Sequence, residues 1–207
     1  MKGLRQDQRR FVWNRYFNSR ETAHGTSGAA AIGALALAIG VIVSAGPAHS
    51  CGPDARVQFT EGSDDTFLIE NNSVIGLTLQ QMAIDLSSTA GGVIFDTDYG
   101  GAGWSAYQPF NPLPSTATLR AASSGLDGYQ QLSLVFDRFA PGDRFAFEID
   151  LDDQLQGSEH GQTIVSGNEI AGGAVMGVFT DKHGQTYRAT GYFDTEGQAI
   201  LTQGACS

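Results

Sequence analysis

Apolar and polar residues alternate with a period of two along most of the chain after residue 55, which indicates β-strands. The clearest example is the segment 144–152, where every second residue is large and apolar: Phe145, Phe147, Ile149 and Leu151. Comparable patterns predict strands at 66–70, 73–86, 93–96, 117–122, 129–137, 174–180, 187–193 and 199–202. No long apolar period of 3.6 residues occurs after residue 50, so the sequence predicts an all-β fold.

Turn residues and one phase slip refine this prediction. The segment 181–184, which ends in glycine, is typical of the turn of a β-hairpin. Leu77 and Leu79 share one parity, whereas the apolar residues from Met82 onward share the other, so we expect a β-bulge at 80–81. Many short strands separated by frequent turns indicate a single-domain antiparallel β-sandwich of the jelly-roll type.

The first fifty residues differ in kind from the rest. Residues 1–28 hold six basic residues against two acidic ones, and residues 29–45 are uncharged and mostly apolar. Pro47 and the small residues near 50 follow, which is the layout of a removable secretory signal. We therefore expect residues 1–50 to be removed and residues 51–207 to form one secreted, periplasmic or cell-surface domain. An uncleaved anchor is the alternative, because the basic leader is longer than in typical signals, although the apolar run is at the low end of what spans a bilayer.

Charge narrows the possible partners. Residues 51–207 carry six Lys or Arg against twenty Asp or Glu, a formal charge of −14, whereas the whole chain has −10. Such a surface repels nucleic-acid phosphates and anionic lipids, so we expect neither nucleic acid nor membrane as a partner after signal cleavage. It suits multivalent cations, cationic partners or simply solubility.

The chain has two cysteines, Cys51 and Cys206, near the two ends of the expected mature domain. In an exported protein such a pair indicates a disulfide, which would tie the two termini together. The alternative makes Cys51 a lipidated first residue, although Ala48 is a poor match for the bulky aliphatic residue usual three positions earlier.

Carboxylates are the most abundant functional groups that could bind a ligand or take part in catalysis. Two groups follow predicted strands, where backbone carbonyls are free: Asp96 with Asp98, and Asp150 with Asp152 and Asp153. Calcium prefers six to eight oxygen ligands of this kind, so both groups are candidate calcium sites. Because side chains alternate along a strand, we expect Asp150 and Asp152 on the outer face. A solvated acidic face that protects an edge strand is the alternative.

Other functional signals are weaker. The segment 99–115 is rich in Gly, Pro and aromatic residues. Trp104 and Tyr107 in it form a candidate sugar-stacking surface of a carbohydrate-binding domain, unless the loop folds its aromatics back over the sandwich. Paired carboxylates also occur in glycoside hydrolases, but acidic residues are too common here for a pair to be specific. His160 and His183 each precede a glycine, and we expect both in exposed turns.

Several segments together resemble a known family. They include 66–73, 77–86, 95–98, 128–136, 139–152 and 170–180. Over about residues 57–193 the chain is similar to bacterial secreted proteins that resemble the sponge aggregation factor core protein. This resemblance implies calcium-assisted extracellular adhesion or aggregation, with a surface glycan or protein as partner, and it supplies no catalytic residues.

Overall fold

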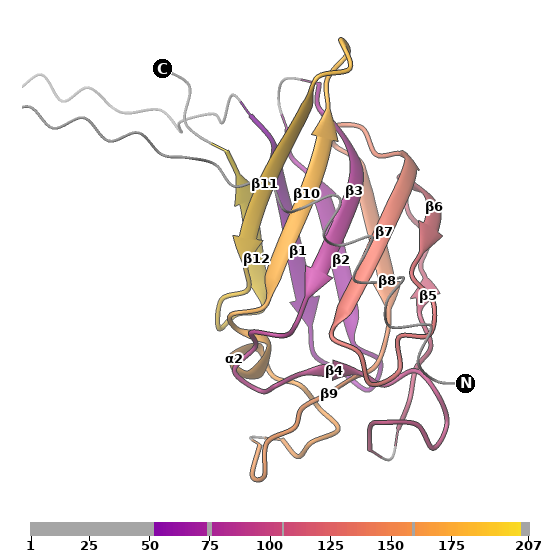
Figure 1. Cartoon of the computed structure of the whole chain (residues 1–207), viewed down its shortest axis with the longest axis vertical. Helices are drawn as coiled ribbons and strands as arrows, with labels where there is room; N and C mark the ends of the chain where they lie inside the picture. Colours follow the sequence, from indigo (N-terminus) through magenta and orange to yellow (C-terminus); the bar gives the residue numbers. More distant parts are fainter. Residues whose placement is uncertain (1–51, 74–75, 105, 159, 204–207) are drawn as a thin grey trace, which may run out of the picture. The chain divides into compact units, whose positions relative to one another are not determined.

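Two five-stranded antiparallel sheets pack face to face in the computed structural model, which describes residues 52–73, 76–104, 106–158 and 160–203 (Figure 1). The first sheet contains β1 (Asp54–Thr60), β2 (Thr66–Asn71), β5 (Asn111–Pro112), β8 (Arg144–Glu148) and β12 (Gln198–Thr202), in the order β12-β1-β2-β8-β5. The second contains β3 (Thr78–Asp85), β6 (Thr118–Ala122), β7 (Gln131–Arg138), β10 (Ala174–Thr180) and β11 (Thr186–Tyr192), in the order β11-β10-β3-β7-β6. The predicted all-β sandwich is confirmed.

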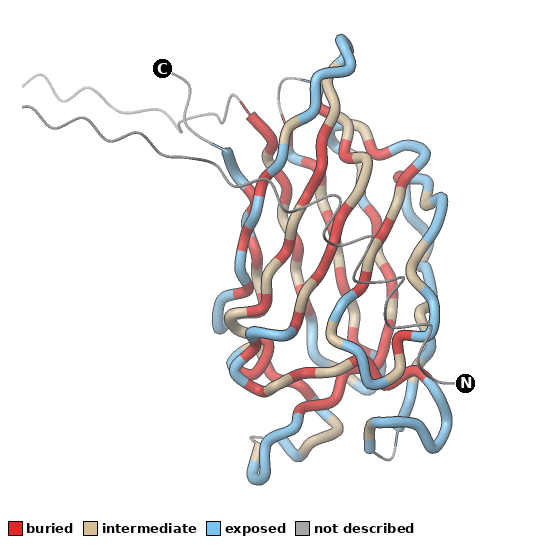
Figure 2. The backbone as a smooth tube through the Cα atoms, in the orientation of Figure 1, coloured by how far each residue is buried: buried red, intermediate tan, exposed pale blue. Residues whose placement is uncertain are grey.

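The alternation of the sequence maps onto the space between the sheets. Buried and less buried positions follow each other along the strands (Figure 2). Phe67 and Phe147 stack across β2 and β8 with ring centroids 5.0 Å apart, and both are fully buried. The predicted hairpin is also present, since β10 and β11 pair from Ala174 with Tyr192 to Thr180 with Thr186. Period-two patterning therefore located most of the core correctly.

The predicted bulge in β3 is confirmed. Val178 of β10 lies opposite Gln81, but the next residue, Phe179, lies opposite Leu79. Gln80 is thus the extra residue, and it lets both Leu79 and Met82 face the core. The strand begins at Thr78 instead of residue 73. Gly76, two residues before the strand, has a positive φ of 71°, which is a turn conformation and not a strand conformation.

The alternation predicted one strand over 144–152, and this prediction is wrong. Strand β8 ends at Glu148, and the chain continues into the short β9 (Leu151–Asp152), which pairs with β4 (Ile94–Phe95). The Ile149 N–H still donates to the Asp65 carbonyl at 3.0 Å, whereas Asp96 N–H donates to the Asp150 carbonyl at 3.0 Å. The chain thus leaves the main sheet and joins a two-stranded sheet at one end of the sandwich (Figure 1).

Three elements were missed by the sequence pattern. They are β1, the two-residue β5 and the short helix α2 (Gly167–Ile170). Helix α2 begins after Ser166, whose backbone N–H donates to the Glu169 carboxylate at 2.7 Å, an arrangement typical of a capping box. A helix of four residues is too short to show a 3.6-residue period.

The chain enters and leaves the sandwich at neighbouring positions. Strands β1 and β12 pair with Asp54 opposite Thr202, and Gln203 N–H donates to the Pro53 carbonyl at 3.4 Å. This adjacency is what the predicted disulfide requires. Cys51, Cys206 and the predicted signal segment 1–50 lie outside the described residues, so the disulfide and the signal stay predictions. Within the described residues, no helix is long and apolar enough to cross a membrane.

Candidate metal centre

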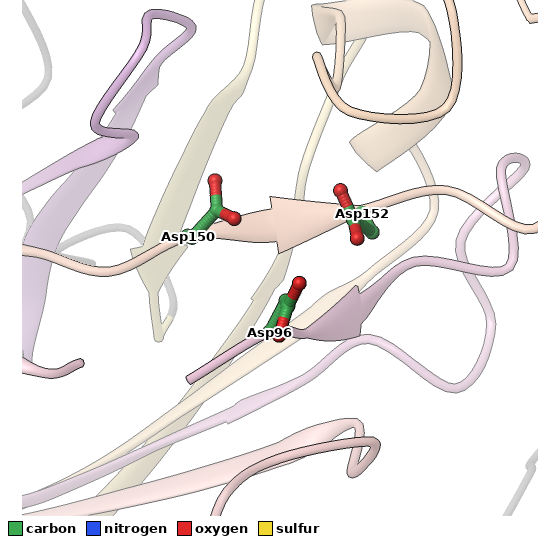
Figure 3. Close-up of side chains that lie close together, drawn as sticks. All are labelled: Asp96, Asp150 and Asp152. Atoms are coloured by element: carbon green, nitrogen blue, oxygen red, sulfur yellow. The ribbon is translucent and has the colours of Figure 1, made fainter. Parts of the chain in front are cut away.

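Three aspartates from the two candidate groups meet at the end of the sandwich that carries β4 and β9. Asp96 directly follows β4, Asp150 precedes β9, and Asp152 lies in it. Figure 3 shows their side chains gathered between these two neighbouring segments. One carboxylate oxygen from each residue lies within 4.8 Å of the others. The pairing of β4 with β9 therefore joins parts of two sites that the sequence predicted separately.

The expected outer-face position of Asp150 and Asp152 is wrong. Asp96 and Asp150 are 2% exposed and Asp152 is 0% exposed. The parity of the strand was correct, because Ile149 and Leu151 are in the core. However, the polar face of β9 does not reach solvent, because a loop crosses it: Trp104 N–H donates to Asp152 Oδ2 at 2.5 Å.

Gly103 allows this loop to lie directly on the carboxylates. A Cβ atom added at Gly103 would overlap Oδ2 of both Asp96 and Asp152. Its φ is not in the left-handed region, so the requirement is for space and not for an unusual backbone conformation. Glycine at this position lets the main chain close over the site.

Each aspartate also has an oxygen without a partner among the described residues. Asp96 Oδ1, Asp150 Oδ2 and Asp152 Oδ1 are buried and accept no hydrogen bond. The adjacent Asp153 is similar: its Oδ1 accepts the Leu155 N–H at 2.7 Å, while its Oδ2 is buried and unpaired. Buried carboxylate oxygens nearly always have a partner, so a proton, a water molecule or a cation would satisfy these oxygens.

Burial and mutual repulsion both oppose ionisation of these groups. Burial, followed by the charge of Asp152, raises the pKa of Asp96 to about 7 and that of Asp150 to about 7. Burial likewise raises the pKa of Asp152. The three ion pairs among the described residues all lie elsewhere, so no Arg or Lys there compensates the cluster. A shared proton or a bound cation would relieve the repulsion.

Two further aspartates support the centre, and sequence reasoning did not assign either to it. Asp65 is 1% exposed and accepts N–H groups of Gly62 at 3.2 Å and Leu151 at 3.1 Å. Burial, followed by the charge of Asp150, raises its pKa to about 8. The sequence pattern placed Asp65 just before the strand that is β2. Its proximity to Asp150 could not be predicted in this way, because it depends on the pairing of β2 with β8.

The segment 97–110, which crosses the carboxylates, is called the covering loop below. Asp127 holds the start of this loop. Its carboxylate accepts backbone N–H groups of Thr97 at 3.2 Å, Asp98 at 3.3 Å and Ala102 at 2.9 Å. The side chain of Asp98 is exposed, so this predicted ligand lies apart from the buried group. Nothing in the local sequence around Asp127 distinguished it from a surface aspartate.

The predicted sugar-stacking residues lie on the same loop. Trp104 is 51% exposed, Tyr107 is 45% exposed, and Tyr99 is 87% exposed. Tyr99 and Tyr107 contact edge to face, with ring centroids 5.8 Å apart. Phe110 instead packs against Phe147 at 5.0 Å. The loop therefore folds one aromatic inward and keeps three at the surface.

The chain matches no protein-family model and no curated protein. The resemblance to aggregation-factor-like proteins accordingly stays a prediction. What the site can do chemically must be judged from its geometry.

That geometry favours cation binding over glycoside hydrolysis. A hydrolase needs two carboxylates on either side of a bound saccharide, with access for the sugar and for water. Here the carboxylates are at most 2% exposed, and Gly103 and Trp104 cover them. A small desolvated ion fits such a centre, whereas a sugar ring does not. His160 and His183 are both exposed, as expected.

Proposed function

We propose that this protein is an exported, calcium-binding β-sandwich module that acts in adhesion or aggregation at a cell surface or matrix. The observation that carries the calcium assignment is the group of unpaired, buried oxygens of Asp96, Asp150 and Asp152. Three negative charges without a protein cation favour a divalent ion more strongly than a single shared proton.

The oxygens lie close enough together to bind one calcium ion. Calcium binds oxygen at about 2.4 Å, so two ligands on opposite sides of the ion lie up to about 4.8 Å apart. One oxygen from each aspartate lies within 4.8 Å of the others. Magnesium requires about 2.1 Å and near-ideal octahedral geometry, and it usually keeps several of its waters, so a buried group made of protein oxygens suits it less well.

The adhesive part of the proposal depends on other observations. The sequence resembles secreted proteins similar to an aggregation factor, and residues 51–207 carry a formal charge of −14. A cation that neutralises part of this charge reduces repulsion between copies of the module and between the module and other acidic surfaces.

Calcium titration of the purified domain tests the metal assignment. We expect calorimetry to show one binding event, and the thermal midpoint to rise in calcium more than in magnesium or in sodium chloride of equal ionic strength. Binding to the folded state adds about 2.7 kcal/mol at a hundredfold excess over Kd. For a domain of this size that corresponds to a rise of roughly 5–10 °C.

A double variant, Asp150→Asn with Asp152→Asn, removes two of the buried carboxylates and should abolish the specific calcium effect. The matched control, Asp98→Asn with Asp137→Asn, removes the same charge from two exposed positions and should retain it. An equal response to calcium and magnesium, unchanged in the buried double variant, would leave only general charge screening. Calcium-dependent clustering of beads coated with the domain tests adhesion separately.

A further inference from the structure

The covering loop is attached to the candidate metal centre at several points. Trp104 N–H donates to Asp152, and Gly103 lies against Asp96 and Asp152. Past the aromatic stretch, Gln108 N–H donates to the Asp96 carbonyl at 3.2 Å, and Asp150 N–H donates to the Gln108 carbonyl at 3.1 Å. All three aspartates thus bind the loop on either side of Tyr107, Asp152 through its side chain and Asp96 and Asp150 through their main chains.

The exposed aromatics of the domain concentrate on this loop. Of the eight large apolar side chains exposed among the described residues, three lie between positions 99 and 107: Tyr99, Trp104 and Tyr107. Leaving such rings in water forfeits the free energy that burial would supply. The loop has room to bury an aromatic, as Phe110 does against Phe147. The three exposed rings therefore suit a ligand with flat apolar faces.

We propose that the cation at Asp96, Asp150 and Asp152 fixes this loop, so that Tyr99, Trp104 and Tyr107 form a stacking surface for the rings of a neutral saccharide. The proposal rests on the calcium binding proposed above and extends it to a ligand class. The ion acts as a structural support and does not contact the saccharide, because its candidate ligands are at most 2% exposed.

The charge of the domain selects the ligand class. Residues 51–207 carry a formal charge of −14, which repels acidic polysaccharides, phosphates and acidic peptides. A neutral saccharide avoids this repulsion and offers both C–H faces for aromatic rings and hydroxyls for polar groups. The exposed Asp98 carboxylate, next to Tyr99, is a suitable acceptor for such hydroxyls.

Coupling between cation binding and the arrangement of the loop follows from the electrostatics of the metal centre. Without a cation, the carboxylates beneath Gly103 repel one another once they lose their protons, which favours separation of the segments that carry them. With a cation they converge, and the loop that they hold keeps its aromatics in one arrangement. A surface ordered in advance binds its ligand more tightly, because less conformational entropy is lost on binding.

Retention of the domain on insoluble neutral polysaccharides tests the proposal directly. The probes are cellulose, chitin and granular starch, each with the intact domain in calcium and in EGTA. We expect retention on at least one of them, with binding about tenfold weaker in EGTA. Trp104→Ala and Tyr107→Ala should each weaken binding in calcium by about five- to tenfold, the usual effect of removing a stacking ring.

Two controls separate this surface from the metal centre. Tyr192→Ala removes a 65% exposed aromatic from β11 and should leave retention unchanged. Calcium calorimetry on Tyr107→Ala should give the wild-type Kd, because the metal is held by the aspartates and the hydrogen bonds from the loop to them come from the main chains of Trp104 and Gln108.

Three outcomes would overturn the inference. They are no retention on any of the three polysaccharides in calcium, retention that is equal in EGTA, and retention that survives both aromatic substitutions. In the first of these cases, retention on an immobilised cationic peptide would show that the domain binds a positively charged partner instead of a saccharide. Calorimetry distinguishes the two proposals: normal calcium binding without calcium-dependent retention refutes only the saccharide surface, whereas absent calcium binding refutes the metal centre itself.

Discussion

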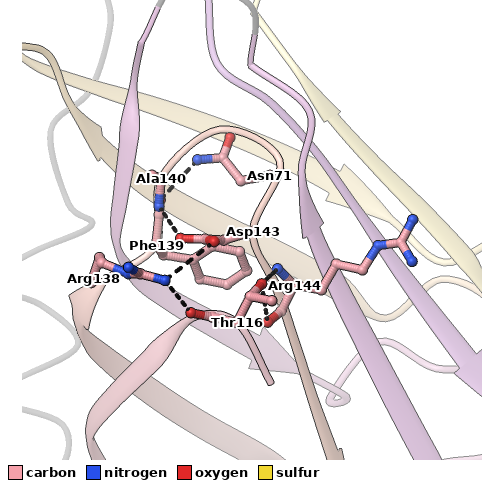
Figure 4. Close-up of polar contacts among 7 residues, drawn as sticks. All are labelled: Asn71, Thr116, Arg138, Phe139, Ala140, Asp143 and Arg144. Carbon is pink, nitrogen blue, oxygen red and sulfur yellow. Dashed lines mark hydrogen bonds and ion pairs between the residues drawn. The ribbon is translucent and has the colours of Figure 1, made fainter. Parts of the chain in front are cut away.

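At one end of strands β2 and β8 the polar side chains have protein partners, whereas at the other end buried carboxylates face one another. At the first end, the Asn71 amide donates to the carbonyls of Leu77 and Phe139, both at 2.9 Å, and its oxygen accepts the Ser73 N–H at 3.2 Å. Figure 4 shows this amide beside the loop that joins β7 to β8. Every hydrogen-bonding group of a fully buried amide is thus used.

Charge at this end is also balanced within the chain. Asp143 accepts the Ala140 N–H at 2.9 Å and lies 3.5 Å from Arg138 (Figure 4). Arg144 pairs with Glu70 at 2.8 Å. This end is called the balanced end below, and the opposite end, which holds Asp96, Asp150 and Asp152, is called the aspartate end. The aspartate end has no such arginine among the described residues. Two of the six basic residues in 51–207 thus pair with acidic side chains at the balanced end, whereas no ion pair among the described residues reaches the aspartate end, where we propose a cation from solution.

The largest expected difference between the two ends is in their response to pH. In the calcium-free folded state Asp65 has a pKa of about 8, and Asp96 and Asp150 have pKa values of about 7. In the unfolded chain these groups titrate near pH 4. Between these limits the folded state retains protons that the unfolded chain has lost, so stability is highest at acidic pH and falls as pH rises.

Urea unfolding of the chelator-treated protein from pH 5 to pH 8 measures this slope. We expect a loss of about 1.4 kcal/mol per pH unit for each proton retained only by the folded state. Saturating calcium should reverse the trend, because it binds the ionised carboxylates. A calcium-free stability that is flat across this range would remove the contrast between the ends.

Substitution at the balanced end should have the next largest effect. Asn71→Ala leaves the carbonyls of Leu77 and Phe139 without this donor in a buried place, which we expect to lower the free energy of unfolding by about 2–4 kcal/mol. The loss should be equal with and without calcium. Asn72→Ala, at the exposed neighbouring position, is the matched control and should change stability little. A calcium-dependent loss in Asn71→Ala would show that the two ends are coupled.

A smaller effect, specific to the aspartate end, is expected from Gly103→Ala. The added Cβ overlaps Oδ2 of Asp96 and Asp152, so either the loop or these two carboxylates must shift, and both changes disturb the group of oxygens. We expect the calcium Kd to rise about tenfold, or about 1.4 kcal/mol, measured by calorimetry. Gly62→Ala is the control at the same end, because its Cβ would lie at an ordinary distance of 3.5 Å from the Asp64 carbonyl oxygen. An unchanged Kd in Gly103→Ala would show that loop and metal centre are independent.

The smallest expected effect belongs to the solvated ion pair at the balanced end. The Arg144 side chain is 67% exposed, so its pairing with Glu70 at 2.8 Å contributes little. Arg144→Met should lower the free energy of unfolding by less than about 1 kcal/mol, and salt should reduce the difference. A loss above about 2 kcal/mol in urea unfolding would mean that this pair is a major support of the balanced end.

The local pattern of the chain was sufficient for the fold class and for most of the strands. Alternation placed Phe145, Phe147, Ile149 and Leu151 in the core, and the parity change after Leu79 located the bulge in β3. These features are readable because side chains alternate strictly along a strand, so each residue's neighbours in sequence determine its face. The candidate ligands Asp96, Asp150 and Asp152 were also identified by type and by their position after apolar strands.

Only the tertiary structure decided that these ligands share one buried centre. Alternation specifies the face of a strand but not what covers that face, and it predicted Asp150 and Asp152 to be solvent-exposed. Their burial depends on β9 leaving the main sheet to pair with β4 and, for Asp152, on Gly103 lying against its carboxylate. Both are contacts between residues about fifty positions apart in the chain. Period-two patterning carries no information about such pairings, because it records only the side to which each residue points.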